Sequence, residues 1–397
     1  MVVNVLRKIK RKLICHYNTF IYKYGIYLYN NILVHLPIID HLIMFESEGD
    51  FCDNSWALYQ YLRKKKKYKF VWIVQHPEHF SNTEDTIFVS RYKHNRIRSY
   101  YYCARSRYSF YTHWTFQEIN FREKQTIVKL AHGCGMIKKA KGNSKDYFDF
   151  TVLSGEASLD YYMDIYNRPK ESFPILGLAR NDLLINNIGS GHDNPYCKNR
   201  DFKKLILWMP TFRKSVNAKL SENITDTNTG LPLIESFEEL QEFDVQLGIR
   251  GIIVLIKVHH LQAEKEIFKK KFKNIIILTD KQLSEQEIQL YQIVGKTDAL
   301  LTDYSGISFD YLLTDKPIGY ILYDIEKYEK SRGFYYDDIR PLFPGKHIYN
   351  KIDLKGFLDD VIIEKDNYKN ARNLLKGKVH YSDKGNSCEL ICNYFNL

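Results

Sequence analysis

The chain has 397 residues, 44% of them hydrophobic, and a formal net charge of +11 with a pI near 9.0. This length and apolar content are enough to fill two globular cores and exclude a chain too polar to fold. The positive charge favours an acidic partner, but it does not choose between nucleic acid, a nucleotide, an anionic lipid surface and a phosphate polymer.

The cellular compartment is indicated by the cysteines and by the N-terminal hydropathy. Seven cysteines are scattered along the chain and none forms a CxxC pair, which predicts a reducing cytoplasm and no structural zinc. The longest uncharged N-terminal run, residues 24–39, is interrupted by polar residues and Pro37, so it fits neither a spanning helix nor a secretory leader. We therefore expect the protein to stay on the side of the membrane where it is made.

The first residues carry basic and apolar side chains together. Wound as a helix, VLRKIKRKLI (residues 5–14) has an apolar stripe beside a basic face, which favours lying on an anionic leaflet. The alternative is a solvated helix packed on its own domain. We predict a membrane-associating helical segment over residues 1–38 and a peripheral position on the cytoplasmic face of a bacterial cell membrane.

The rest of the chain alternates between strand and helix patterns. A buried strand over 39–47 is followed by a helix around 55–63, and a Tyr/Arg-rich segment runs through Tyr108. Such alternation predicts parallel α/β layers, and the Gly/Asn/Pro-rich stretch 186–201 is the best linker candidate. We expect a domain over 39–190 and a second over 191–397, with ligands at the carboxyl ends of strands. Further strand-like runs are residues 67–76, 86–90, 126–133, 148–155, 205–212, 251–260, 274–280, 298–306 and 316–324.

The stretch TDYSGISFDYLL places a turn, Asp303 to Gly306, between a strand and a helix. Amides at a helix start, with the hydroxyls of Ser305 and Ser308 beside them, suit a phosphate group. The alternative is that Asp303 or Ser305 only caps the helix, because every helix start has backbone donors to satisfy.

Another strand, IVLIKVHH, ends in Lys257, His259 and His260. A lysine neutralises phosphate charge and a histidine donates to phosphate or carries a proton. A single histidine at a strand end is commonly structural, and alternation places these two on opposite faces.

The stretch KLAHGCGMIKKAKG contains His132, followed by Gly133 and Gly135 and then by Lys138 and Lys139. Glycines allow close approach to the backbone and leave an imidazole accessible, as a general base requires. The alternative is a glycine-rich turn with a surface histidine. The sequence shows no residue placed to activate the thiol of Cys134, so it does not favour Cys134 as a nucleophile.

Two further motifs can be interpreted either as parts of a binding site or as ordinary structural elements. In WMPTFRK, Arg213 can grip a diphosphate in bidentate fashion, although a lone loop arginine usually meets only solvent. GLARNDLL, residues 177–184, is either a hinge between domains or an ordinary helix start.

Taken in order, these motifs resemble those of the CDP-glycerol glycerophosphotransferase family, whose members prime and polymerise teichoic acids and related capsule polymers in bacteria. The resemblance covers about residues 45–338, and the block from TDYSG to RGFYYD is the most specific part. The stretches that carry it are FESEGDFCDNSWALYQYL, HGCGMIKK, GLARNDLL, WMPTFR, IKVHH, TDYSGISFDYLLTDKPIGY and YEKSRGFYYD.

The resemblance implies a GT-B fold, in which two Rossmann-like domains face each other across a cleft. It also implies transfer of glycerol phosphate from CDP-glycerol to a hydroxyl of a lipid-linked acceptor, with release of CMP. His132 matches the family's base for the acceptor hydroxyl, and His259 matches a histidine that holds the donor diphosphate. The implied donor-binding residues are Arg213, Lys257, Asp303, Ser305, Gly306, Ser308, Arg332 and Gly333, and the implied acceptor-binding residues are Gly133, Lys138 and Lys139.

Three departures from the family pattern leave the identity of donor and acceptor open. Cys134-Gly135 stands where the family has Thr-Pro, His260 stands for a proline, and Gly306 stands for a second serine. CDP-ribitol is the closest alternative donor. A further alternative is that the chain is another GT-B enzyme, which uses a different nucleotide-activated donor.

Phosphoryl transfer depends mainly on positioning and charge neutralisation. No DxD-like pair lies at a likely donor-strand end, so we predict no obligatory protein-bound metal, with Mg²⁺ on the donor diphosphate left open. A nonenzymatic basic protein that binds nucleic acid or membrane is the alternative of a different class. No nucleic-acid module is visible and the 31 tyrosines are spread along the chain, so we expect no nucleic-acid partner.

Overall fold

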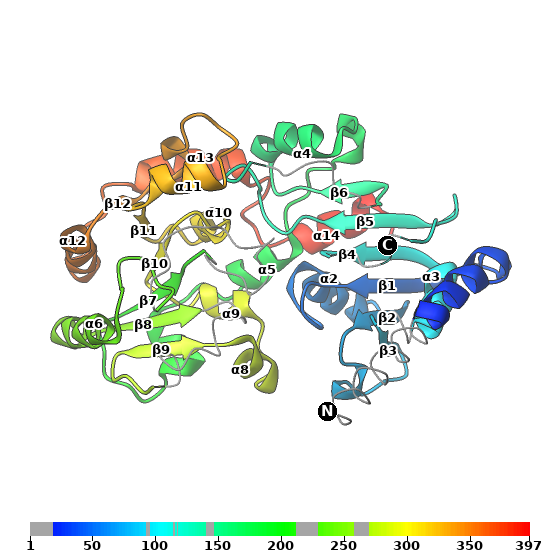
Figure 1. Ribbon diagram of the computed structural model, residues 1–397, viewed down its shortest axis with the longest axis horizontal. Helices are drawn as coiled ribbons and strands as arrows, with labels where there is room; N and C mark the ends of the chain where they lie inside the picture. The colour runs from blue at the N-terminus through cyan, green and yellow to red at the C-terminus, as the bar shows by residue number, and fades with distance from the viewer. Residues whose placement is uncertain are drawn as a thin grey trace, which may run out of the picture.

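The computed structural model describes residues 19–92, 96–113, 116, 118–139, 147–211, 229–257 and 270–397. These residues form two six-stranded sheets, each in its own half of the molecule (Figure 1). Every strand pair in both sheets is parallel, as the alternation of strand and helix patterns predicts.

The first sheet has the strand order β3-β2-β1-β4-β5-β6. Its strands are apolar over most of their length because helices cover both faces. Phe45, for example, lies opposite Trp72 on one side and Phe110 on the other, and all three are fully buried. The strands are β1 (Ile39–Glu46), β2 (Lys69–Val74), β3 (Thr86–Ser90), β4 (Ser106–Tyr111), β5 (Thr126–Leu130) and β6 (Phe150–Val152).

The second sheet has the order β12-β11-β10-β7-β8-β9, which repeats the topology of the first when its strands are counted from β7. In both sheets the first and fourth strands of the half are neighbours, and the strand order reverses between them. Doubly wound sheets bind ligands beyond the carboxyl ends of strands at such a reversal. The strands are β7 (Lys204–Met209), β8 (Ile252–Lys257), β9 (Ile275–Leu278), β10 (Ala299–Thr302), β11 (Ile318–Ile321) and β12 (Lys346–Ile348).

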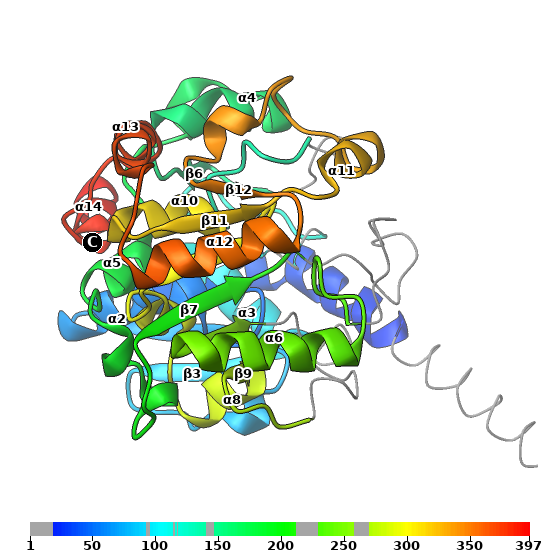
Figure 2. The same cartoon turned by 90° about the vertical axis from the view of Figure 1, so that its left-hand side faces the viewer.

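Helices cover both faces of each sheet. In the first half, a helix over 19–31 and α3 pack on one face, while α2 covers the other. In the second half, α6 and α12 cover one face together and lie toward the viewer in Figure 2. The helices are α2 (Asp53–Lys64), α3 (Ile97–Arg105), α4 (Leu159–Tyr166), α5 (Ala179–Ile185), α6 (Phe237–Arg250), α8 (Asp280–Glu285), α9 (Leu290–Val294), α10 (Ile307–Tyr311), α11 (Ile325–Ser331), α12 (Lys351–Ile362), α13 (Lys369–Val379) and α14 (Ser387–Tyr394).

Short 3-10 turns connect many of these elements. Two of them, each capped by the side chain of a preceding residue, lie in the stretch 186–201, which the sequence predicts to be a linker. The turns are η1 (Leu33–His35), η2 (Pro77–His79), η4 (Glu156–Ser158), η5 (Lys170–Ser172), η6 (Gly191–Asp193), η7 (Pro195–Cys197), η8 (Leu312–Thr314) and η9 (Arg340–Leu342).

The last helix returns to the first half, and Figure 1 places the C-terminus beside β4 and β5. Cys388, Ile391 and Cys392 of α14 are buried in the same core cluster as α2. The carboxylate of Asp182 in α5 accepts the backbone N–H of Ser387 and Cys388, each at 2.8 Å. Residues 387–397 therefore pack on the first sheet, although the sequence-based division groups them with the second.

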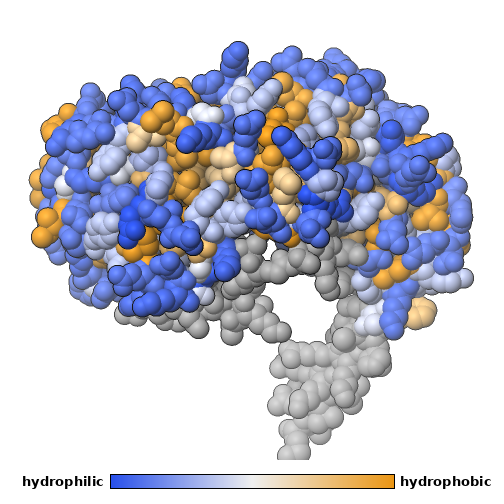
Figure 3. Space-filling view, turned by 90° about the horizontal axis from the view of Figure 1, so that it is seen from above, coloured by the Kyte–Doolittle hydropathy of each residue, from blue (hydrophilic) through white to orange (hydrophobic). Residues whose placement is uncertain are grey.

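The two halves share a core. Met136 and Ile137, which follow β5, are buried in the same cluster as Ile307 and Phe309 of α10. The face seen from above is mostly hydrophilic, with a band of apolar residues near its middle (Figure 3). Among the helices of the described residues, none has the length and apolar character needed to cross a membrane.

Candidate active site

His132 follows the carboxyl end of β5 and is held by a carboxylate from another element. Its Nδ1 lies 3.2 Å from Oδ2 of Asp53, while Nε2 faces the more distant Glu48 carboxylate at 4.0 Å. The imidazole is 66% exposed, so its outer nitrogen is accessible. The hydrogen bond with Asp53 raises the pKa of His132 above its usual value, and the charge of Asp53 adds to this effect.

Asp53 is the first residue of α2, and its backbone has φ of +63°. Aspartate is one of the few residue types that adopts this left-handed region without a large penalty. Burial alone would raise the pKa of Asp53, but the Arg180 charge and the His132 hydrogen bond hold it well below its usual range. Asp53 is therefore an ionised carboxylate that orients His132 and favours its protonated form.

Arg180 of α5 links this histidine to the second half. Its guanidinium donates to Asp53 Oδ1 at 2.9 Å, to the His132 carbonyl at 3.0 Å and to Asp310 Oδ2 at 2.8 Å. Asp310 lies in α10, directly after the predicted phosphate turn. The side chains of Arg180 and Asp310 are 6% and 0% exposed, so the pair is shielded from solvent.

Asp310 has further donors. It accepts from the Tyr291 hydroxyl at 2.5 Å and from the Asn181 amide at 3.3 Å, and the Arg180 guanidinium lies over the Tyr291 ring. Burial raises the pKa of Tyr291 well above its usual value, so the phenol keeps its proton and donates.

The predicted donor turn lies where the order of the second sheet reverses. Asp303 is fully buried, and its Oδ1 accepts from the backbone N–H of Thr211 at 2.7 Å and from the Thr211 hydroxyl at 2.5 Å. Asp303 thus joins the ends of β10 and β7. No side chain caps α10, whose N-cap is Gly306, so the interpretation of Asp303 or Ser305 as a mere cap is wrong.

The small residues of this turn differ in their surroundings. Ser308 is buried, and its hydroxyl donates to the Ser305 carbonyl at 2.9 Å. Among the described residues, no atom lies within 4 Å of a Cβ placed on Gly306, so this part of the chain leaves the space beside it open. The turn therefore presents Gly306 to open space, while Ser308 holds the turn from inside.

The predicted acceptor and nucleotide segments are neighbours. Lys139 donates its backbone N–H to the Gly333 carbonyl at 3.1 Å, and Arg332 donates to the Lys139 carbonyl at 2.6 Å. Lys138 and Phe334 form an antiparallel bridge. The two segments, far apart in sequence, therefore form one continuous backbone contact between the halves.

The loop after His132 requires glycine. Gly135 has φ of +69°, and a Cβ there would lie 2.2 Å from the Tyr161 ring. Proline needs φ near −65°, so the Thr-Pro of the family pattern does not fit this backbone. Gly133 lies beside the Arg180 guanidinium, because a Cβ placed on Gly133 would be 3.7 Å from Nη2 of Arg180.

Cys134 is not placed for nucleophilic chemistry. It is 1% exposed, and its Sγ lies 2.9 Å from the Ser154 hydroxyl. Burial raises the pKa of this thiol to about 12, so the thiolate is scarce at neutral pH.

Some predicted donor residues can be placed and others cannot. Lys257, at the end of β8, is buried and lies 2.8 Å from Asp280. Arg213, His259 and His260 lie outside the described residues, so their roles stay predictions.

Four residues of this network, Asp53, Arg180, Tyr291 and Asp310, are not among the site residues predicted from the sequence. A signal was present for three of them, because Asp53, Arg180 and Asp310 all lie inside the motifs that carry the family resemblance. Arg180 is the one basic residue of GLARNDLL, in which leucines and an alanine lie on either side of the polar residues. Tyr291 lies outside those motifs and gave no such signal.

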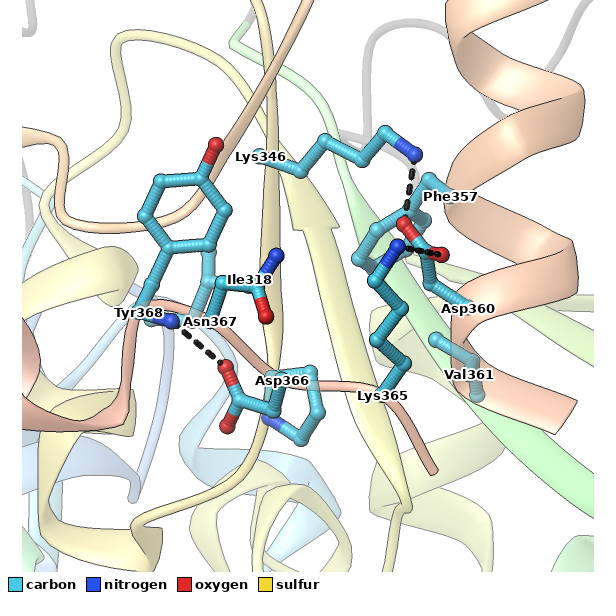
Figure 4. Close-up of a pocket in the computed structure, with 10 residues that line it drawn as sticks. Ile318, Lys346, Phe357, Asp360, Val361, Lys365, Asp366, Asn367 and Tyr368 are labelled. Atoms are coloured by element: carbon cyan, nitrogen blue, oxygen red, sulfur yellow. Dashed lines mark hydrogen bonds and ion pairs between the residues drawn. The ribbon is translucent and has the colours of Figure 1, made fainter. Parts of the chain in front are cut away.

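A small pocket in the second half is unrelated to this site (Figure 4). It holds about 20 Å³ and lies at the amino end of β11, the edge of the sheet opposite to the ligand-binding edge. Its charges are paired, with Lys346 and Lys365 both beside Asp360. Its lining residues are Pro317, Ile318, Lys346, Phe357, Asp360, Val361, Lys365, Asp366, Asn367 and Tyr368.

Comparison with solved structures confirms the GT-B-like fold. The wall teichoic acid polymerase TagF superposes with a TM-score of 0.74 at 20% identity, covering 99% of this chain and 96% of that one. A UDP-GlcNAc 2-epimerase from Neisseria meningitidis superposes with a TM-score of 0.52 at 11% identity, over 91% of this chain and 100% of that one. At these identities the likeness concerns the fold alone.

Curated relatives agree in their names. The teichoic acid glycerol-phosphate transferase of Staphylococcus aureus is 24% identical, over 93% of this chain and 96% of that protein. The teichoic acid poly(glycerol phosphate) polymerase of Staphylococcus epidermidis is 24% identical, over 76% and 43%. The teichoic acid ribitol-phosphate primase of Bacillus spizizenii is 26% identical, over 54% and 56%. The chain thus spans about half the length of the last two relatives.

The family assignment rests on a match over nearly the whole chain. The model of the CDP-glycerol:poly(glycerophosphate) glycerophosphotransferase family matches residues 28–396, which include both sheets and the seven stretches that carry the resemblance. The chain belongs to the CDP-glycerol:poly(glycerophosphate) glycerophosphotransferase family.

Proposed function

We propose that this chain transfers glycerol phosphate from CDP-glycerol to a hydroxyl group of a membrane lipid-linked acceptor, in the synthesis of teichoic acid or a capsular polymer, and releases CMP. The observation that carries this proposal is the pairing of His132 with Asp53 at the carboxyl edge of the first sheet. A carboxylate-oriented imidazole with an accessible second nitrogen is the arrangement of a general base.

In this mechanism, Nε2 of His132 takes the proton of the acceptor hydroxyl as its oxygen attacks the β-phosphorus of the donor. The new oxygen–phosphorus bond forms and the bond to CMP breaks, so CMP leaves with the electron pair. Asp53 holds the imidazole through Nδ1 and stabilises the imidazolium that results. The reaction is a displacement at phosphorus that needs positioning and charge neutralisation.

The donor diphosphate is proposed to bind at the order reversal of the second sheet. Ser305 and Gly306 follow β10 there, and Arg332 and Gly333 adjoin the acceptor segment. Arg213, Lys257 and His259 would neutralise the phosphates, and a donor phosphate at Lys257 would compete with Asp280 for the ammonium group. The absence of an obligatory metal stays a prediction, and so does Mg²⁺ on the diphosphate.

CDP-ribitol is the second candidate donor, and one observation favours it. The part of the chain that the structure describes leaves the space beside Gly306 open where the family pattern has a serine, which would leave room for a longer polyol. A relative at 26% identity carries the name teichoic acid ribitol-phosphate primase.

The N-terminal part is proposed to rest on the cytoplasmic face of the membrane. The helix over 19–31 exposes Phe20, Tyr24 and Tyr27 at i, i+4 and i+7, which is one helical face. Aromatic rings favour the interface between lipid and water, and the basic residues of the preceding segment favour anionic lipids.

The test is an assay of CMP release by the full chain. Purified protein is incubated with a lipid-linked acceptor and with CDP-glycerol or CDP-ribitol in parallel, and His132→Ala is the control. The proposal expects CMP release with one donor and extension of the acceptor by polyol phosphate. Release no greater than that of His132→Ala with both donors would overturn it, and product length separates single from repeated addition.

A further inference from the structure

A cluster of potential metal ligands lies outside the site described above. His76, Glu78 and His79 belong to the stretch that follows β2, and each offers one ligand atom within 4.8 Å of the other two. His76 precedes the single turn η2, which contains the other two residues. The proposed transferase mechanism does not use any of them.

The backbone of this cluster is fixed before any ligand binds. The carboxylate of Asp50 accepts the N–H of Gln75 at 2.7 Å and the N–H of His76 at 2.9 Å. The N–H of His79 donates to the His76 carbonyl at 3.0 Å, and Pro77 restricts the first position of the turn. The three side chains therefore project from a rigid turn rather than from a mobile loop.

The side chains already converge. The Nδ1 of His76 lies 3.0 Å from Oε1 of Glu78, and the rings of His76 and His79 stack with centroids 5.0 Å apart. Two ligands bonded to one Zn²⁺ ion at 2.0–2.1 Å lie about 3.4 Å apart in tetrahedral geometry. The side chains of His76 and Glu78 are 46% and 64% exposed, so they are free to rotate. Small rotations can therefore bring the ligand atoms from within 4.8 Å of one another to the distance that a tetrahedral site needs.

The chemistry of the set favours a particular class of ion. Two imidazoles and one carboxylate suit Zn²⁺ and its neighbours among the first-row metals, whereas Mg²⁺ and Ca²⁺ prefer oxygen ligands alone. Without a metal, the same groups would form only a solvated hydrogen bond of little energetic weight.

We propose that His76, Glu78 and His79 form a surface site for a divalent transition-metal ion of the Zn²⁺ type, with at least one coordination position left to solvent. Three protein ligands with an open fourth position are the pattern of zinc sites that exchange a ligand. Asp50, which holds the turn, lies two residues from Glu48, and the Glu48 carboxylate is 4.0 Å from His132, so a bound metal would lie near the edge of the first sheet that carries His132. This inference does not depend on the proposed transferase activity.

The test is calorimetric titration of the full chain, stripped of metal with EDTA, with Zn²⁺ alone. One equivalent is expected to bind with a micromolar dissociation constant, and Co²⁺ should give the visible absorption of a tetrahedral or five-coordinate ion. The double variant His76→Ala/His79→Ala should lose this equivalent, and Glu78→Gln should weaken it about tenfold or more. His41→Ala, an exposed histidine of β1, is the matched control and should bind as the natural chain does.

Two readouts keep the result interpretable. Zn²⁺ should raise the melting temperature of the natural chain and of His41→Ala, but not that of the double variant, because only folded chains with the site bind it. Retention of the same equivalent by the double variant would overturn the proposal, as would the lack of saturable binding by the natural chain. Glu78 is exposed, so Glu78→Gln tests the site even if the double variant does not fold.

Discussion

Arg180 and Asp310 form a buried ion pair across the two halves of the molecule, with Nη2 of the guanidinium 2.8 Å from the carboxylate. Removing one partner of such a pair leaves the other charge buried without compensation. We expect Arg180→Gln to lower the free energy of unfolding by about 3–5 kcal/mol. Urea denaturation followed by circular dichroism measures the change.

The control for this variant is Arg250→Gln. Arg250 pairs with Asp359 at 2.7 Å, but the aspartate side chain is 59% exposed. Replacing Arg250 should therefore lower the free energy of unfolding by less than about 1 kcal/mol. If the two variants lose equal stability, the ion pair with Asp310 does not hold the halves together.

The pH dependence of activity should reveal the partnership of His132 with Asp53. His132 acts as a base only when unprotonated, and Asp53 raises its pKa, so activity should fall as pH drops through a value above the usual one. In Asp53→Asn the pKa of His132 falls, so the acid limb of kcat/KM should move to lower pH. An unshifted acid limb in this variant would show that another group titrates.

Cys134 and His132 are neighbours that should differ sharply in their effect on rate. His132→Ala removes the base and should lower kcat by about 10²–10⁴-fold. Cys134→Ala removes a protonated, buried thiol, so it should leave kcat close to that of the natural chain while lowering stability slightly. Loss of activity in a folded Cys134→Ala variant would restore the thiol as a candidate nucleophile.

Two glycines replace larger residues of the family pattern, and they should tolerate substitution very differently. Gly306→Ser should fold with stability within about 0.5 kcal/mol of the natural chain, because the new Cβ meets no atom of the described residues within 4 Å. Gly135→Pro should fold poorly, because its φ of +69° lies far outside the range of proline. Thermal melts compare the two, and the ratio of CDP-glycerol to CDP-ribitol turnover in Gly306→Ser tests its part in donor choice.

Membrane binding should depend on the exposed aromatic face of the N-terminal helix. Replacing Phe20, Tyr24 and Tyr27 together by serine should reduce flotation with anionic liposomes and leave the melting temperature unchanged, because all three side chains face solvent. Equal flotation of the variant and the natural chain would contradict the proposed anchor.

The fold could be predicted from the sequence where strands are uninterrupted apolar runs. β8, with the sequence IIVLIK, is such a run, and it lies within the predicted strand stretch. β4 reads SRYSFY and β12 has only three residues, so neither carries a clear strand pattern. Their place in the sheets depends on pairing with distant strands, which local periodicity does not encode.

The site was predicted where chemistry is local and missed where it depends on distant contacts. His132 could be found because it ends a strand-like run and two glycines, Gly133 and Gly135, follow it in the sequence. Arg180 lies 48 positions from His132 and 130 positions from Asp310, and its pair with Asp310 exists only after both halves pack. The same holds for the backbone contact between Lys139 and Gly333.

The return of α14 to the first half has a consequence for how the protein is made. The ribosome completes all six strands of the first sheet long before it adds Cys388 and Ile391, which fill the core beside α2. Until those residues emerge, the first half exposes an apolar face, and Asp182 lacks the two N–H donors that it receives from Ser387 and Cys388. Nascent chains stalled before residue 387 should therefore bind chaperones. When α14 emerges from the ribosome, it should complete the core of the first half.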